Sequence, residues 1–210
     1  MKNKIPLCLI LLLVALYVLD QATKWYIVTH YRMPMITPLI SFMDSTPIWS
    51  DNGILHFNIV RLHNSGVAFG MGNGTVWAPF VFLAVQVVAL VGLFHLFRKG
   101  FFCTRLMRVA WAFVTAGVLG NMTDRLLQGF FLPGADAEGI TFFDKLKAGY
   151  VVDFLDFSFP WLPTEGFPQG YHWPSFNVAD SCVCIAAGLF IISAFFTPEP
   201  EKAEEKASAA

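Results

Sequence analysis

The chain has 210 residues, of which 56% are hydrophobic and only 14% are charged, and its mean hydropathy is +0.57. Soluble domains usually carry about 25% charged residues, so this composition predicts an integral membrane protein. The length suits one small helical bundle rather than several domains. The net charge of −1, without a basic stripe, gives no indication of a nucleic-acid partner.

The four cysteines do not have the pattern of a disulfide framework. Cys8, Cys182 and Cys184 lie in apolar runs, and Cys103 lies in a short basic loop. Cys182 and Cys184 are two residues apart, which would place them on different sides of a helix. We interpret these residues as buried apolar thiols rather than as a metal site. The cysteines therefore predict no metal site, and we also expect that the protein needs no cofactor.

The N-terminal segment predicts a first membrane helix. Met1–Lys4 is basic and Pro6–Leu19 is apolar, as in the charged start and hydrophobic region of a secretory signal. No small-x-small cleavage site follows, and the apolar character resumes up to Val28. About 23 residues rising 1.5 Å each can span a bilayer. We expect a retained helix at residues 6–28; a cleaved signal is the alternative.

Three further apolar runs predict three more membrane helices, at residues 76–97, 106–125 and 177–196. The predicted fold class is therefore a membrane all-α protein, a four-transmembrane-helix bundle that forms one domain over residues 1–196. The charged segment 197–210 is expected to be a disordered cytoplasmic tail.

Two longer segments, residues 29–75 and 126–175, are too polar and too rich in turn residues to cross the membrane. Within the first, the alternation from Ile54 to Arg61 is typical of short strands with one apolar face, so we expect a small extramembranous β-sheet at the membrane surface. Basic residues gather at the N-terminus and at the loop 98–105. The positive-inside rule therefore places both termini in the cytoplasm and the two polar segments outside.

Polar clusters that are distant in the sequence all fall on this outer side. They are Asp20 with Lys24, Asn64, Asn121 to Arg125, Asp153, and Asn177 to Asp180. Such convergence on one surface is stronger evidence for a functional site than any single motif.

Two of the clusters are open to a simple structural interpretation. Asp20 and Lys24, four residues apart, share a helix face, and could form either a local ion pair or a strut that orients the first helix against the site. Asn64 begins a small-residue loop; it could belong to a tight turn or present its amide to a peptide backbone.

A third cluster lies near the end of the predicted helix 106–125. Asn121, Asp124 and Arg125 are spaced i, i+3 and i+4 and therefore share one face. Arg125 could snorkel to the interface beside Asp124. In a site, Asn121 and Arg125 would donate to a substrate carbonyl, and Asp124 would fix the guanidinium.

The two remaining acids are the candidates for catalysis. Asn177 and Asp180 could simply cap a helix. Asp153, however, lies between Val152 and Phe154, where a carboxyl should have a raised pKa. Two such carboxyls brought together would titrate as a pair. A pair can hydrolyse a peptide because one carboxylate activates water while the protonated partner polarises the carbonyl. No Gly-x-Ser-x-Gly or His-Glu-x-x-His motif competes.

Five ordered motifs resemble the boxes of the lipoprotein signal peptidase (signal peptidase II) family. They are Leu19-Asp20-Gln21-Ala22-Thr23-Lys24, Asn64-Ser65-Gly66-Val67-Ala68-Phe69, Gly120-Asn121-x-x-Asp124-Arg125, Val151-Val152-Asp153-Phe154 and Phe176-Asn177-x-Ala179-Asp180.

The resemblance implies an aspartic peptidase of the bacterial inner membrane. Such an enzyme removes the signal peptide from a diacylglyceryl-modified prolipoprotein, before the lipidated cysteine, with its active site near the periplasmic face. The expected partners are this substrate and membrane lipid, and we expect a monomer. The resemblance implies catalytic roles for Asp153 and Asp180, substrate binding by Asn64, Asn121, Arg125 and Asn177, and structural support from Asp20, Lys24 and Asp124.

The chain departs from the compact family pattern at two apparent insertions, Leu126–Tyr150 and Asp156–Ser175. Asp156 is also close to Asp153, but only Asp153 fits the Val-Val-Asp-Phe box. Two other function classes remain alternatives: a proton-coupled membrane transporter and a non-enzymatic membrane scaffold. A transporter would place its acids near the midplane, usually in duplicated halves, whereas the polar motifs here cluster at one face.

Overall fold

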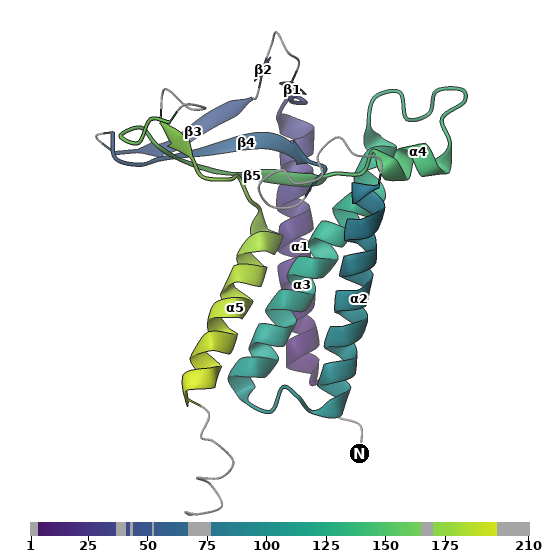
Figure 1. Cartoon of the computed structure of the whole chain (residues 1–210), viewed down its shortest axis with the longest axis vertical. Helices are drawn as coiled ribbons and strands as arrows, with labels where there is room; N and C mark the ends of the chain where they lie inside the picture. The colour runs from purple at the N-terminus through teal and green to yellow at the C-terminus, as the bar shows by residue number, and fades with distance from the viewer. Residues whose placement is uncertain are drawn as a thin grey trace, which may run out of the picture.

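A computed structural model of the chain describes residues 4–36, 41–42, 44–51, 53–66, 77–164 and 170–196. The long helices are α1 (Leu7–His30), α2 (Ala78–Lys99), α3 (Arg105–Leu127) and α5 (Val178–Phe196). They run side by side, and a β-sheet lies across the end of the bundle opposite the α2–α3 connection (Figure 1). The predicted tail 197–210 lies outside the described residues.

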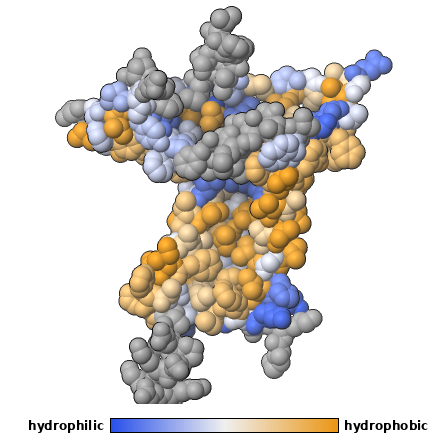
Figure 2. All heavy atoms as spheres, in the orientation of Figure 1, coloured by the Kyte–Doolittle hydropathy of each residue, from blue (hydrophilic) through white to orange (hydrophobic). Residues whose placement is uncertain are grey.

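Three helices of the described chain, α1, α2 and α5, are long and apolar enough to cross a membrane. Their 24, 22 and 19 residues correspond to about 28–36 Å at 1.5 Å per residue. Most of their side chains face outward, so the helices present a hydrophobic surface below a more hydrophilic sheet (Figure 2). This is a membrane protein fold.

The fourth long helix, α3, packs against α1, α2 and α5. It is more polar because Arg108, Asp124 and Arg125 lie near its ends. Small residues allow the close approach of α5: a Cβ atom on Gly117 would lie 2.5 Å from the carbonyl oxygen of Ala179. Close backbone contact of this kind is a usual way to pack helices in a bilayer.

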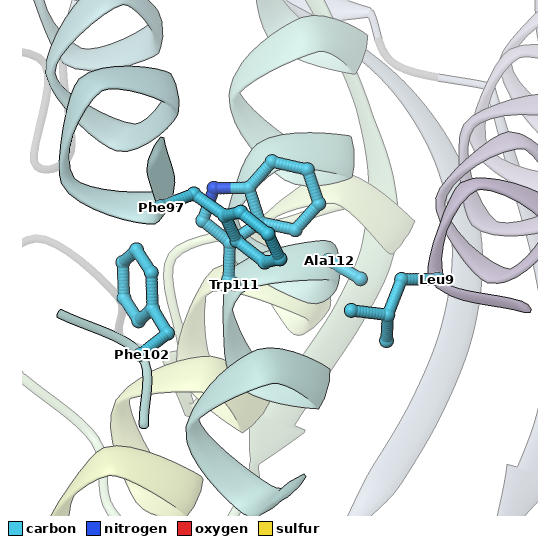
Figure 3. Close-up of a cluster of buried hydrophobic side chains, with 5 residues drawn as sticks. All are labelled: Leu9, Phe97, Phe102, Trp111 and Ala112. Carbon is cyan, nitrogen blue, oxygen red and sulfur yellow. The ribbon is translucent and has the colours of Figure 1, made fainter. Parts of the chain in front are cut away.

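The end of the bundle away from the sheet is closed by a tight α2–α3 turn and an aromatic cluster. Gly100 ends α2 with a φ of +82°, and Thr104 caps α3 by accepting a hydrogen bond from the Met107 N–H at 3.1 Å. The cluster contains Leu9, Phe97, Phe102, Trp111 and Ala112 (Figure 3). These contacts join α1, α2 and α3 at this end.

The predicted small sheet is confirmed, and it is antiparallel. Its order is β3 (Ser45–Ser50), β4 (His56–Asn64), β5 (Val151–Phe159) and β6 (Tyr171–His172). β1 (Met35–Ile36) and β2 (Ser41–Phe42) form a separate two-stranded sheet. The sheet therefore combines strands from both segments that the sequence placed outside the membrane.

The sheet is fixed to the C-terminal end of α1. Ile27 packs in a buried cluster with Val152 and Phe154 of β5. Arg61 of β4 donates from Nη1 to the backbone carbonyls of Val28 and Tyr31, at 2.9 and 2.8 Å. A cation that satisfies the last carbonyls of a helix also interacts favourably with the helix dipole. These contacts set the position of β5, which carries Asp153.

The first apparent insertion connects α3 to β5. It contains a 3-10 helix, η2 (Gln128–Phe131), and a short helix, α4 (Phe142–Lys147). Thr141 and Asp144 form a capping box at the start of α4. The second apparent insertion, 156–175, contains the rest of β5 and all of β6.

Candidate functional site

The N-terminus of α5 places Asp180 in a reciprocal cap with Asn177. The Asp180 carboxylate accepts from the Asn177 backbone N–H at 3.2 Å, and the Asn177 side-chain oxygen accepts from the Asp180 N–H at 3.0 Å. The other carboxylate oxygen of Asp180 accepts from the Asn121 amide at 2.8 Å. The capping arrangement is therefore present, but it also orients Asp180 toward α3.

The same Asn177 brings in Asp153. Its side-chain nitrogen donates to the Asp153 Oδ1 at 2.7 Å, and the Asn64 amide donates to Oδ2 at 3.0 Å. Asn177 is fully buried and Asp153 is 1% exposed, whereas Asp180 is half-buried. Asn177 thus contacts both acids, one through its backbone and one through its side chain. The two predicted catalytic residues, 27 positions apart in the sequence, therefore share Asn177 as a hydrogen-bond partner.

The environment of Asp153 favours its protonated form more than water does. Burial and then the negative charge of Asp180 raise the pKa of Asp153 from 3.8 to about 7. The hydrogen bonds from Asn64 and Asn177 and the charge of Lys24 oppose this shift. An acid with a pKa near neutrality can exchange a proton during a reaction at physiological pH.

A buried ion cluster lies beneath the two acids. Lys24 Nζ contacts Asp20 at 2.9 Å, Asp124 at 3.0 Å and the Asn121 oxygen at 2.8 Å. Lys24, Asp20 and Asp124 are each 1% exposed. The three contacts use the three donors of the ammonium group, so the charge is fully paired. The predicted Asp20–Lys24 pair within α1 is present. Through Asp124 and Asn121, the ion cluster also includes α3.

The ion cluster is joined directly to the backbone beside each acid. The Asp20 carboxylate accepts from the Ala179 N–H at 2.8 Å, next to Asp180. The Asp124 carboxylate accepts from the Val152 N–H at 3.1 Å, next to Asp153. Both bonds couple α1 and α3 to the positions of the acids.

Sequence reasoning overlooked one member of this network, Gln21. Its amide nitrogen lies 3.0 Å from an Asp20 oxygen and 3.2 Å from both an Asp124 oxygen and the Gly120 carbonyl. Gln21 was visible in the first motif, but a helical glutamine beside an acid gives no distinctive pattern of its own.

Arg125 has different partners from those expected. Within the described part of the chain, the Asp124 carboxylate contacts Lys24, Gln21 and the Val152 N–H, whereas Arg125 donates from Nη2 to the Gly66 carbonyl at 2.6 Å. The Arg125 guanidinium also lies 5.2 Å from the centre of the Phe82 ring. Its Nε and Nη1 atoms are buried and have no hydrogen-bond partner among the described residues.

The Asn64 side chain makes hydrogen bonds within the protein through both its oxygen and its nitrogen. Its side-chain oxygen accepts from the Gly66 N–H at 3.1 Å, so the predicted turn is present. Its nitrogen contacts Asp153 and is already used within the site.

Asp156 belongs to a separate cluster. It is 2% exposed and accepts from the Asn58 amide at 3.1 Å. It also contacts His172 at 3.0 Å and, at 3.4 Å, the Ser175 hydroxyl. These contacts fix β6 and the segment before Asn177 against β5. Asp156 therefore does not replace Asp153 in the cluster around Asn177.

Comparison with known proteins identifies the family. Residues 12–196 match the family described as signal peptidase (SPase) II. The chain belongs to the signal peptidase II family. It is therefore a protease, and the resemblance drawn from the five motifs is confirmed.

Relatives in this family match nearly the whole chain. The lipoprotein signal peptidase of Alteromonas mediterranea is 30% identical over 199 residues, 92% of this chain and 86% of the relative. That of Symbiobacterium thermophilum is 31% identical over 183 residues, 87% of this chain and 91% of the relative. These signal peptidase II relatives are bacterial, in agreement with a bacterial membrane protein.

Two solved structures described as bacterial membrane enzymes share the fold. Both have a TM-score of 0.61, with sequence identities of 28% and 27%. The alignments cover 93% and 94% of this chain and 92% and 98% of the solved chains. The shared fold therefore includes both the helices and the sheet, the two parts that meet at the cluster around Asn177.

Proposed function

We propose that Asp153 and Asp180 are the catalytic pair and share one proton. The observation that carries the proposal is the position of Asn177, which donates to one carboxyl from its side chain and to the other from its backbone. Asp153 is 1% exposed and Asp180 is half-buried, so both carboxyls are largely withdrawn from water. Two carboxyls in such a place cannot both ionise easily and titrate together.

The reaction that this pair performs is direct hydrolysis. The ionised carboxylate takes a proton from water as the water oxygen attacks the scissile carbonyl carbon. The protonated carboxyl donates to the carbonyl oxygen. When the tetrahedral gem-diol collapses, the C–N bond breaks, the leaving nitrogen takes a proton from the protonated carboxyl, and one hydroxyl of the intermediate returns its proton to the other carboxylate. The cycle ends with one proton again on the pair.

The surrounding polar residues have two roles. Asn64, Asn121 and Asn177 hold the aspartates, since each has an amide hydrogen bonded to one of the carboxylates. Arg125 binds the substrate: its buried Nε and Nη1 donors have no partner among the described residues and can donate to a peptide carbonyl. Any substrate contact of the three asparagines then uses the hydrogen-bonding capacity that the aspartates leave.

The substrate is a diacylglyceryl-modified prolipoprotein, which is cut before the lipidated cysteine. The acids lie where the helices meet the sheet, so a lipid-bearing peptide can reach them laterally from the bilayer. In this proposal α3 is the fourth transmembrane helix, and residues 1–196 form one domain. The basic residues near the α2–α3 connection support a cytoplasmic location of both termini and a periplasmic location of the sheet. The enzyme acts as a monomer, because one chain supplies the whole cluster.

The function is tested by incubating the purified chain with a prolipoprotein in two forms, with and without the diacylglyceryl group. We expect cleavage of the lipidated form before its cysteine and little cleavage of the other form. Equal cleavage of both forms would contradict the proposed substrate class. Transport of protons without any cleavage would favour the transporter alternative.

The pH dependence of cleavage follows from Asp153. Its pKa of about 7 means that the pair loses its shared proton as the pH rises through this value. We expect kcat/KM to fall about tenfold per pH unit above that point. Replacing Asn64 with alanine removes a hydrogen bond that lowers this pKa, so the Asn64→Ala profile should fall at a higher pH.

A matched control is available on the same pair of strands. Asn58 donates to Asp156 at 3.1 Å, much as Asn64 donates to Asp153. The Asn58→Ala variant should keep the pH profile of the unmodified enzyme. The pH at which kcat/KM falls should therefore differ between the two variants. If this pH is unchanged in Asn64→Ala, or shifts equally in both variants, the role of Asp153 would be contradicted.

A further inference from the structure

The segment between α3 and β5 carries a set of exposed hydrophobic side chains. We define this interfacial patch by its members: Leu127, Phe131, Ile140, Phe142 and Phe143. Phe142 and Phe143 are 61% and 64% exposed, and the other three are also exposed. Exposed aromatic side chains that lie close together usually mark an interaction surface.

The patch has a defined shape because the segment closes on itself. A Cβ atom on Gly129 would collide with the Lys145 carbonyl oxygen and would lie 3.0 Å from the Gly149 nitrogen. The Lys145 side chain pairs with Asp136 at 2.9 Å and lies 5.6 Å from the centre of the Phe130 ring. The two ends of the segment therefore touch, and internal contacts fix the residues between them.

The patch is continuous with the surface of a membrane-spanning helix. The Phe131 ring lies 5.9 Å from the ring of Trp25, which is itself exposed on α1. Trp25 lies five residues before the end of α1, about 7.5 Å below it along the helix axis. Exposed aromatic side chains near the ends of membrane helices usually lie in the headgroup zone.

Ring contacts extend the patch away from α1. Phe130 lies 5.4 Å from Phe142, and Phe142 lies 5.9 Å from Phe143. The short helix α4 lies beside the ends of α2 and α3, at the same end of the bundle as the sheet (Figure 1). The hydrophobic surface of the helices continues up to this region (Figure 2).

We propose that residues 127–148 are an interfacial membrane anchor, with the patch inserted among lipid headgroups and upper acyl chains. The partner is the bilayer itself. Charge does not drive the insertion: Lys145 and Lys147 are outnumbered by Asp136, Glu138 and Asp144. The anchor should therefore insert equally well into zwitterionic and anionic bilayers, to about 5–10 Å as for other interfacial segments.

The anchor has a consequence for the active site. A Cβ atom on Gly149 would collide with the Arg125 carbonyl oxygen, so the end of the anchor is packed against the α3 residue beside Asp124. Asp153 follows four residues later on β5. A fixed depth of the patch therefore fixes the height of β5 above the lipid.

Spin-label depth measurements test the anchor without using cleavage, so the result is independent of the proposed chemistry. The exposed cysteines Cys8, Cys103 and Cys184 are replaced with alanine. Single labels are then attached at Phe143→Cys, at Ile140→Cys and, as the control in the same segment, at the exposed Glu138→Cys. Each full-length protein is reconstituted into phosphatidylcholine vesicles and, separately, into vesicles containing phosphatidylglycerol.

Relaxation by oxygen and by a water-soluble nickel chelate gives the depth of each label. We expect the labels at 140 and 143 to be reached mainly by oxygen in both kinds of vesicle, and the label at 138 mainly by nickel. Nickel access at 143 equal to that at 138 would overturn the proposal. Spin–spin broadening at 143 that vanishes on dilution with unlabelled protein would also overturn it, because a second copy would then cover the patch.

Discussion

Changing Asp153 to asparagine, or Asp180 to asparagine, lowers kcat for prolipoprotein cleavage by at least about 10³-fold. Asparagine has nearly the size of aspartate but can neither take a proton from water nor deliver one to the carbonyl oxygen. Because the two carboxyls act as one unit, the double variant should be no slower than the slower single variant. The rates are measured with purified protein and lipidated substrate.

Asp156→Asn is the control for this prediction. It makes the same chemical change on the same strand, in a buried acid that contacts Asn58 and His172 rather than Asn177. This variant should retain cleavage. If Asp153→Asn or Asp180→Asn, still folded, cleaved at a rate near that of the unmodified enzyme, the assignment of the pair would be wrong.

Replacing Lys24 with methionine destabilises the protein by about 3–5 kcal/mol, because it leaves the buried carboxylates of Asp20 and Asp124 without their cation. These carboxylates also hold the N–H groups of Ala179 and Val152, so cleavage should be lost as well. Unfolding is followed in detergent by temperature or denaturant.

Lys147→Met provides the matched comparison. Lys147 lies 3.6 Å from Asp144 in an ion pair whose side chains are more than 40% exposed. Solvent screens a surface pair of this kind, so its loss should change stability little. Equal stability losses in the two variants would show that the cluster under the acids is not a buried ion network.

The sequence was sufficient to predict the elements whose signals are local. Long apolar runs gave the helices, with ends that differ by one to a few residues; for example, residues 106–125 were predicted where α3 is Arg105–Leu127. Such differences arise at caps and frayed turns, where hydrophobicity no longer decides the boundary. The alternation from Ile54 to Arg61 located most of β4.

The strand that carries Asp153 was not predicted. Residues 151–154 of β5 are all buried, so they lack the polar and apolar alternation that marks a half-exposed strand. The partner of β5 is β4, which precedes it by about ninety residues. The enrichment of β5 in Val and Phe was a usable signal for a strand. Its pairing with β4 over such a separation, however, cannot be deduced from the local sequence pattern.

The partner of Asp124 illustrates the same limit. Its neighbour in the sequence, Arg125, was the expected partner, yet Lys24 on another helix is the residue that pairs with it. Spacing along one helix defines which residues share a face, but not which face of another helix meets them.

The most direct test of the shared proton is the ionisation of Asp153 itself. The ¹³Cγ signal of Asp153 in isotope-labelled protein is followed by NMR as the pH is varied, in the unmodified enzyme and in Asp180→Asn. We predict that Asp153 keeps its proton up to about pH 7 and that removing the charge of Asp180 lowers its pKa. An Asp153 that is already ionised at pH 5, or a pKa that is unchanged in Asp180→Asn, would contradict the proposed pair.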